Sequence, residues 1–210
     1  MRFVSRQDAG RRLGEYLRFR GVSADLILGL PRGGVVVAAE IARELDRPLD
    51  VLVVRKIGHP IQREFAVGAM AEPELIFLEQ EGRDVDPEAL DAIIIEETGR
   101  LHDYSERFHL TGMPEVAGKS VLLIDDGFAT GATAEAAALS VKHRHATRVI
   151  VAAPVASLDA MDRLRRVVDA VEVLAVDEAF ESVGQYYDAF EQTTDGEVIS
   201  LLREAVAKAA

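Results

Sequence analysis

The chain has 210 residues, of which 49% are hydrophobic and 29% are charged, and its formal net charge is −12. This length and composition are typical of one globular domain, so we expect residues 1–210 to form a single domain. The absence of cysteine excludes disulfides, thiolate nucleophiles and cysteine-bound zinc, and the acidic charge disfavours binding to the phosphate backbone of nucleic acids.

The first part of the chain alternates apolar runs with helical patterns. Ser5 can cap a first helix, and a second helix follows the motif at residues 31–34 and runs through Leu45. Four apolar runs are predicted to be strands: residues 25–30, 49–54, 65–71 and 75–78. A polar stretch that begins at Arg55 follows the second of these strands.

The alternation continues to the end of the chain. Asp86 followed by Pro87 marks the start of a helix at 87–109, which we interpret as a helical insertion at about 86–110. Three further strands are predicted at residues 121–124, 147–153 and 171–176, and three helices at 131–144, after Ser157 and from Asp195. Strands separated by helices favour an α/β fold with a mainly parallel sheet and helices on both faces. Such sheets bind ligands beyond the carboxyl ends of their strands.

The loop after the strand at 121–124 carries the strongest indication of function. Two adjacent carboxylates, Asp125 and Asp126, begin it, and the next residues are Gly127, Phe128, Ala129, Thr130, Gly131, Ala132 and Thr133. A glycine-rich loop that enters a helix offers backbone N–H groups and the positive end of the helix dipole to an anion. The carboxylates are good acceptors for neighbouring hydroxyls, so a ligand with a phosphate beside a ribose diol fits both halves of the loop.

Two other kinds of nucleotide-binding loop do not match these residues. An ATP-type P-loop would need a lysine at the position of Ala132, and the dinucleotide fingerprint G-x-G-x-x-G is absent. A purely structural turn, in which Asp126 caps the following helix, stays open as the alternative.

The run at 121–133 resembles the defining motif of the type I phosphoribosyltransferases: a hydrophobic strand, two acidic residues and a Thr-Gly-x-Thr phosphate loop. The resemblance implies that Asp125 and Asp126 hold the ribose hydroxyls of phosphoribosyl pyrophosphate (PRPP) and that Gly127 to Thr133 hold its 5-phosphate. Purine-salvage members often carry an acid where this chain has Ala129, which argues against a hypoxanthine or guanine acceptor. The whole chain is also similar to a bacterial subgroup of the family whose acceptor is unsettled.

Two basic segments are candidates for binding the leaving pyrophosphate. The first segment is residues 31–34, which follow the first predicted strand. Gly33 and Gly34 allow its backbone N–H groups to face an anion, and Arg32 adds a forked donor. The resemblance makes this the pyrophosphate loop of the family, in which the Pro31–Arg32 peptide would be cis. In the second, Arg55 and Lys56 follow the predicted second strand, where the family has a flexible catalytic loop. An ordinary turn and a solvated basic pair are the structural alternatives.

Residues 177–194 form an acidic, aromatic stretch, which we call the hood segment because the resemblance implies that it covers the acceptor. Its aromatic candidates for stacking on that acceptor are Phe180, Tyr186 and Tyr187. Simple packing of the last helix against the sheet is the alternative.

Together these features predict a PRPP-dependent phosphoribosyltransferase of nucleotide metabolism, which transfers a pentosyl group to a nitrogenous acceptor and releases pyrophosphate. Arg55, Lys56, Asp125 and Asp126 are its candidate catalytic residues. Mg²⁺ would be bound mainly through PRPP. The protein could also form a homodimer. The alternatives are a non-catalytic PRPP-sensing regulator that acts through a protein partner and, more weakly, a hydrolase of PRPP.

The sequence also predicts where the protein works. No apolar run approaches the roughly 18–20 residues that a membrane span needs, and the first residues lack the apolar core of a signal peptide. We therefore expect a cytoplasmic protein without a membrane partner.

Overall fold

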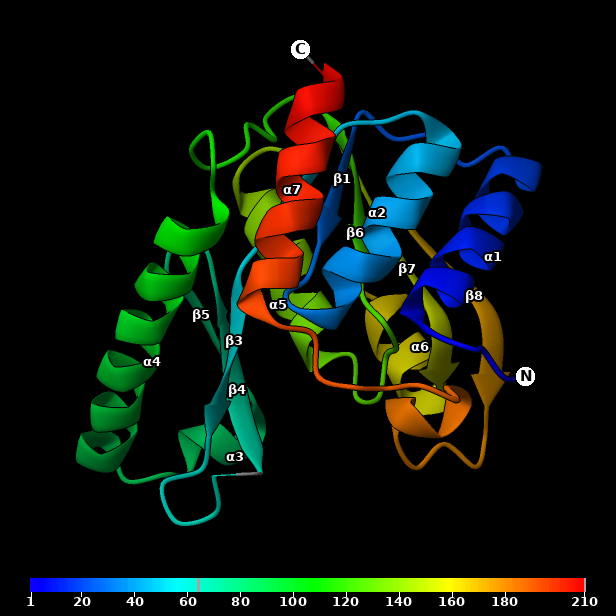
Figure 1. The fold of residues 1–210 in the computed structure, drawn as a ribbon. Coiled ribbons are helices and arrows are strands. Elements are labelled where there is room, and N and C mark those ends of the chain that lie inside the picture. The colour runs from blue at the N-terminus through cyan, green and yellow to red at the C-terminus, as the bar shows by residue number, and fades with distance from the viewer. Residues whose placement is uncertain (64, 210) are drawn as a thin grey trace.

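Five parallel strands form the central sheet of this computed structural model, which describes residues 1–63 and 65–209 (Figure 1). Their order across the sheet is β2-β1-β6-β7-β8. The strands are β1 (Leu26–Gly29), β2 (Leu49–Val51), β6 (Ser120–Ile124), β7 (Arg148–Ser157) and β8 (Ala170–Asp177). All neighbouring pairs in this sheet are parallel, so the predicted α/β fold class is confirmed.

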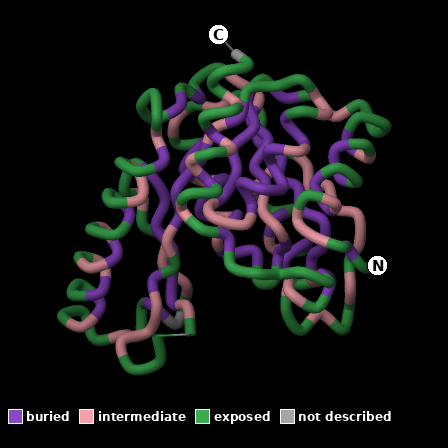
Figure 2. Tube along the Cα trace, viewed as in Figure 1, coloured by how far each residue is buried: buried purple, intermediate pink, exposed green. Residues whose placement is uncertain are grey.

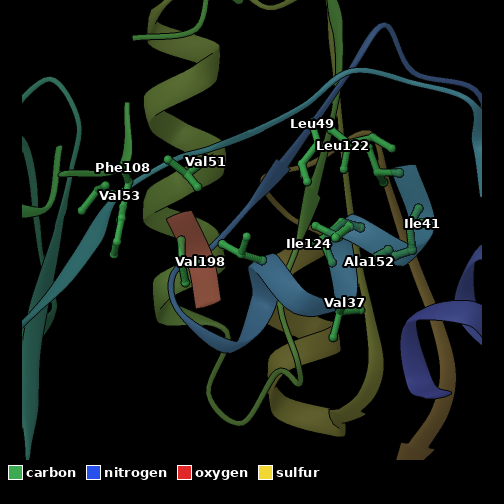
Figure 3. Close-up of a cluster of buried hydrophobic side chains, with 14 of the residues drawn as sticks. Val37, Ile41, Leu49, Val51, Val53, Phe108, Leu122, Ile124, Ala152 and Val198 are labelled. Atoms are coloured by element: carbon green, nitrogen blue, oxygen red, sulfur yellow. The ribbon is translucent and has the colours of Figure 1, made fainter. Parts of the chain in front are cut away.

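Helices cover both faces of the sheet. α1 (Arg6–Phe19), α2 (Gly33–Leu45) and α7 (Asp195–Ala209) pack on one face, and α5 (Ala132–His143) and α6 (Leu158–Leu164) pack on the other. Because successive side chains of a strand point to opposite faces, Leu122 and Ile124 join the first core while Val121 and Leu123 join the second. Figure 3 shows the first core, and Figure 2 shows that the buried residues concentrate along the central strands.

A smaller antiparallel sheet stands beside the central one (Figure 1). Its strands, in order, are β3 (Val54–Gly58), β4 (Ala66–Ala71) and β5 (Leu75–Leu78), followed by the short α3 (Gln80–Arg83). The predicted long helix is present as α4 (Pro87–Phe108), and the Asp86 carboxylate caps it by accepting a hydrogen bond of 3.0 Å from the amide of Ala89.

The prediction of one continuous strand at 49–54 is wrong. β2 ends at Val51, and the chain then leaves the parallel sheet and enters the antiparallel one at Val54. The amide of Val53 donates to the side chain of the buried Glu72 at 3.0 Å, and the carbonyl of Val53 accepts from the amide of Glu72 at 3.2 Å. Glu72 therefore redirects the chain between the two sheets, which apolar patterning alone does not show.

The hood segment folds back against the N-terminus. It contains a short 3₁₀ helix (Val183–Tyr186), after which Tyr187 pairs with Phe3 in an isolated parallel bridge. Among the described residues, no helix is both long enough and apolar enough to cross a membrane.

Candidate functional site

A cavity of about 450 Å³ lies where the carboxyl ends of β1 and β6 meet the start of β3. Residues far apart in the sequence line it: Pro31, Val54, Arg55, Lys56, Asp125 to Gly131, Thr133, Ala134 and Val183. The position agrees with the expectation that ligands bind beyond the carboxyl ends of parallel strands. The predicted loop at 125–133, except for Ala132, thus forms one wall of a cavity, and Arg55 and Lys56 of the second basic segment line it as well.

The phosphate half of the loop is shaped by Gly131. This residue has φ +74° at the start of α5, a left-handed conformation that glycine adopts without strain. Thr130 is exposed, and its Oγ1 accepts a hydrogen bond of 3.4 Å from the amide of Ala132. The first turn of α5 is directed at the cavity, whose lining includes Thr133 and Ala134. This end of the cavity is suited to a small anion.

The other half of the loop brings two carboxylates together. The Asp125 carboxylate accepts a hydrogen bond of 2.8 Å from the amide of Asp126. Burial, followed by the charge of Asp126, raises the pKa of Asp125 well above its usual range, and the charges of Lys56 and Arg6 act in the opposite direction. Paired carboxyl groups with perturbed pKa values cluster at functional sites, and their oxygens can accept hydrogen bonds from ligand hydroxyls.

Arg6 is a residue of this site that the sequence did not indicate. Its Nε donates to Oδ2 of Asp126 at 2.7 Å, and the side chains are only 11% and 15% exposed, respectively. Burial raises the pKa of Asp126 above its usual value, and the charge and the hydrogen bond of Arg6 offset only part of this shift. Because 120 residues separate the two, neither local pattern nor spacing could have paired them.

The loop at 31–34 supports the acidic loop from behind. Pro31 lines the cavity, and the Pro31–Arg32 peptide is cis, as the family resemblance implied. A Cβ on Gly33 would collide with the Asp126 carboxylate, and one on Gly34 would lie 2.6 Å from the carbonyl oxygen of Ile124. These two glycines therefore allow the loops to approach each other closely.

Arg32 does not line this cavity. Its guanidinium lies 3.4 Å from Asp195 and borders an adjacent recess, which it shares with Arg55 and Tyr104. Pro31 lines both the cavity and this recess, whereas Arg32 lines only the recess. Contrary to the prediction from the sequence, the structure therefore does not bring the Arg32 side chain to the acidic loop.

Arg55 and Lys56 lie on a strand, so their predicted place in a loop is wrong. They are consecutive residues of β3, and both reach the lining of the cavity. Lys56 is exposed, whereas Arg55 is anchored: its Nε donates to Glu97 of α4 at 2.9 Å and its guanidinium lies 5.4 Å from the Tyr104 ring centroid. The helical insertion therefore fixes one of the two cations.

The predicted acceptor-stacking tyrosines are buried, which corrects their role. Tyr186 and Tyr187 are 5% and 3% exposed, so their rings are not free to stack on a ligand. The Tyr187 hydroxyl donates to the backbone carbonyl of Asp126 at 2.6 Å, and that of Tyr186 donates to Asp177 at 2.8 Å. Phe180 packs on Tyr186, with ring centroids 5.3 Å apart. Of the hood segment, Val183 is the residue that lines the cavity.

The sequence matches a known protein family and two curated relatives. The family model described as "Phosphoribosyl transferase domain" matches residues 7–190. A protein of Mycobacterium tuberculosis (strain H37Rv), provisionally named a phosphoribosyl transferase, is 41% identical over 208 residues, which cover 97% of this chain. The match covers 47% of the relative, and a protein of strain CDC 1551 matches equally. This chain thus spans about half the length of the curated relatives it matches.

Two solved structures share the fold. The crystal structure of TT1426 from Thermus thermophilus matches with a TM-score of 0.83 and 42% identity, covering 97% of this chain and 99% of that one. The AQ2163 protein from Aquifex aeolicus matches with a TM-score of 0.52 at 14% identity, covering 85% and 78% of the two chains. The second likeness shows the fold alone.

Proposed function

Because this chain belongs to the phosphoribosyl transferase family, we propose that it transfers the 5-phosphoribosyl group of PRPP to a nitrogenous acceptor and releases pyrophosphate. The observation that carries the proposal is a cavity that combines two half-buried carboxylates, a glycine-threonine loop at a helix start and an exposed lysine. These groups match the three polar parts of PRPP, namely its diol, its 5-phosphate and its pyrophosphate.

Each part of the ligand has a place in this arrangement. The ribose hydroxyls donate to Asp125 and Asp126, and the 5-phosphate lies in the loop at 127–133. The pyrophosphate lies toward Lys56 and Arg55 on β3, beside the loop at 31–34. In this arrangement the two anionic ends of PRPP lie at opposite walls of the cavity: the 5-phosphate at the N–H groups of the loop and the pyrophosphate at the cations of β3.

Magnesium fits this proposal as an ion carried mainly by PRPP. Its preferred ligands are carboxylate, phosphate and water oxygens, and the cavity offers the carboxylates of Asp125 and Asp126 beside the expected diol. When bound, the ion would neutralise charge on the pyrophosphate.

The chemistry asks the protein mainly for positioning. The acceptor nitrogen forms a bond to C1 of the ribose while the bond from C1 to the pyrophosphate oxygen breaks, and the acceptor then loses a proton. Positive charge on the ribose ring rises in the transition state, so the nearby carboxylates and the exclusion of water favour the reaction.

We expect Lys56→Ala to weaken pyrophosphate binding about tenfold and to leave ribose 5-phosphate binding nearly unchanged. The physical reason is the loss of one charge-assisted contact, worth about 1.5 kcal/mol or more, at the leaving-group end only. Titration calorimetry with each ligand measures the two affinities. Lys142→Ala, which removes an exposed lysine on α5 outside the cavity lining, is the matched control. Equal losses for both ligands would contradict the assigned position of the pyrophosphate.

We propose that the acceptor packs against Val183, because this residue of the hood segment lines the cavity. We expect Val183→Ala to lower kcat/KM for the acceptor about tenfold, because burying its methyl groups against a planar acceptor contributes roughly 1–2 kcal/mol. The affinity for PRPP should stay within a factor of about two. A change in PRPP affinity alone, with the acceptor parameters intact, would place the acceptor elsewhere.

The transferase proposal itself is tested by a screen for pyrophosphate release. The protein is incubated with PRPP, Mg²⁺ and a panel of bases and amines, and a positive result is release of pyrophosphate that depends on one acceptor. Tight PRPP binding without release of pyrophosphate for any acceptor would favour the alternative function, a non-catalytic PRPP-sensing regulator. Release without an acceptor would favour the hydrolase.

A further inference from the structure

The N-terminal residues and the hood segment are joined in a way that fixes the start of α1. The amide of Phe3 donates to the carbonyl of Tyr186 at 2.8 Å, and the amide of Ala189 donates to the carbonyl of Val4 at 3.0 Å. Ser5 then caps α1 by accepting from the amide of Asp8. As a result Arg6, the first residue of α1, is held at the edge of the cavity.

The Arg6 side chain makes three kinds of contact: with a carboxylate, with a backbone carbonyl and with an aromatic ring. Besides the 2.7 Å contact of its Nε with Asp126, its Nη1 donates to the carbonyl of Glu191 at 2.7 Å. The face of its guanidinium lies 3.8 Å from the centroid of the Phe190 ring. One nearly buried side chain therefore connects an acid of the cavity to two residues of the hood segment.

Asp126 depends on these neighbours for its orientation. Its carboxylate is backed by Gly33, its carbonyl accepts from the hydroxyl of Tyr187, and its amide is bound by the Asp125 carboxylate. Arg6 supplies the cationic contact that compensates for placing a second carboxylate beside Asp125. Without that contact, two adjacent, half-buried carboxyl groups would disfavour each other's ionisation.

We propose that Arg6 is a positioning residue, which orients the Asp126 carboxylate to accept hydrogen bonds from a ligand diol and favours its ionised form. It acts through Asp126 and does not line the cavity itself. The proposal rests on the proposed function, since it takes the diol of PRPP as the group that Asp126 receives. It assigns to the N-terminal helix a part in donor binding.

Two measurements on Arg6→Gln test the role of Arg6. We expect PRPP affinity at pH 7 to fall about tenfold to a hundredfold, and the loss to shrink as pH rises, because Asp126 then titrates at higher pH. Arg6→Lys should restore part of the affinity, since it keeps the charge. Arg11→Gln is the control, because Arg11 lies on the same helix but is exposed and 3.8 Å from Asp8. A purely structural role of Arg6 would weaken binding equally at every pH.

The second measurement needs no ligand. Carbon-13 NMR of the aspartate carboxyl groups, assigned with Asp126→Asn, follows the titration of Asp126 in the wild type and in Arg6→Gln. An upward shift in the variant supports the proposal, and an unmoved titration overturns it. If the wild type does not bind PRPP, the proposed function fails, and the titration still decides the relation between Arg6 and Asp126.

Discussion

Replacing Asp125 and Asp126 together by asparagine is expected to weaken PRPP binding by at least about a hundredfold. Each carboxylate accepts a charge-assisted hydrogen bond from the ribose diol in the proposed complex, and each such bond contributes about 1.5–3 kcal/mol. Titration calorimetry of the double variant in the presence of Mg²⁺ measures the loss.

The fold should survive this change. Burial and the neighbouring charge raise the pKa of Asp125, so its ionisation opposes the native state and its contribution to stability falls as pH rises toward the folded pKa. Removing that charge offsets the loss of the contact between Asp126 and Arg6. Asp159→Asn is a suitable control, because Asp159 borders a neighbouring recess and not the cavity. Unchanged PRPP affinity in a folded double variant would reject these acids as the diol site.

The parts of the site that the sequence predicted are those made of consecutive residues. The loop at 125–133 could be identified because its carboxylates, glycines and threonines all follow one apolar strand. The position of Lys56 at the cavity was also predicted, although its strand was not. Parallel α/β sheets gather such loops at one edge, so local motifs were sufficient to bring the two walls together.

The parts that the sequence missed depend on tertiary contacts. Arg6 reaches Asp126 only because residues 3 and 4 pair with the hood segment. The acceptor prediction failed for Tyr186 and Tyr187 because an aromatic residue in an acidic stretch can equally fill a core, and burial decides between these roles. Likewise, the early end of β2 depends on Glu72, whose partners come from the insertion helix and the following connection.

Glu72 also organises a buried charged cluster between the two sheets. Its side chain is 1% exposed and accepts from Nε2 of His109 at 2.8 Å and from the Ser105 hydroxyl, and Asp50 lies 3.6 Å from Nδ1 of the same histidine. Burial alone would lower the pKa of His109, but the Asp50 and Glu72 carboxylates outweigh it and raise the pKa to about 9. The histidine is therefore charged at neutral pH.

We expect Glu72→Gln to lower the free energy of unfolding by about 3–5 kcal/mol at pH 7. Removing Glu72 leaves the buried His109 charge with only the more distant Asp50 carboxylate, 3.6 Å from Nδ1, and the cost of breaking a buried ion pair exceeds what the pair itself contributes. Urea denaturation followed by circular dichroism measures the change. The matched control is Glu74→Gln, because Glu74 pairs with His102 at 2.6 Å but both side chains are 54% exposed. A surface pair of this kind contributes about 0–1 kcal/mol.

The pH dependence separates this electrostatic effect from simple loss of packing. A histidine whose pKa is raised on folding contributes stability that is fully present below its ordinary pKa of 6.5 and is lost as pH rises through about 9. The wild type should therefore lose stability across that range, and His109→Gln should remove this component of the slope. In the double variant Glu72→Gln/His109→Gln, part of the stability should return at pH 7, because the buried histidine charge is removed together with its main partner. A wild-type slope that persists in His109→Gln would show that other groups, and not this cluster, set the alkaline limit of the fold.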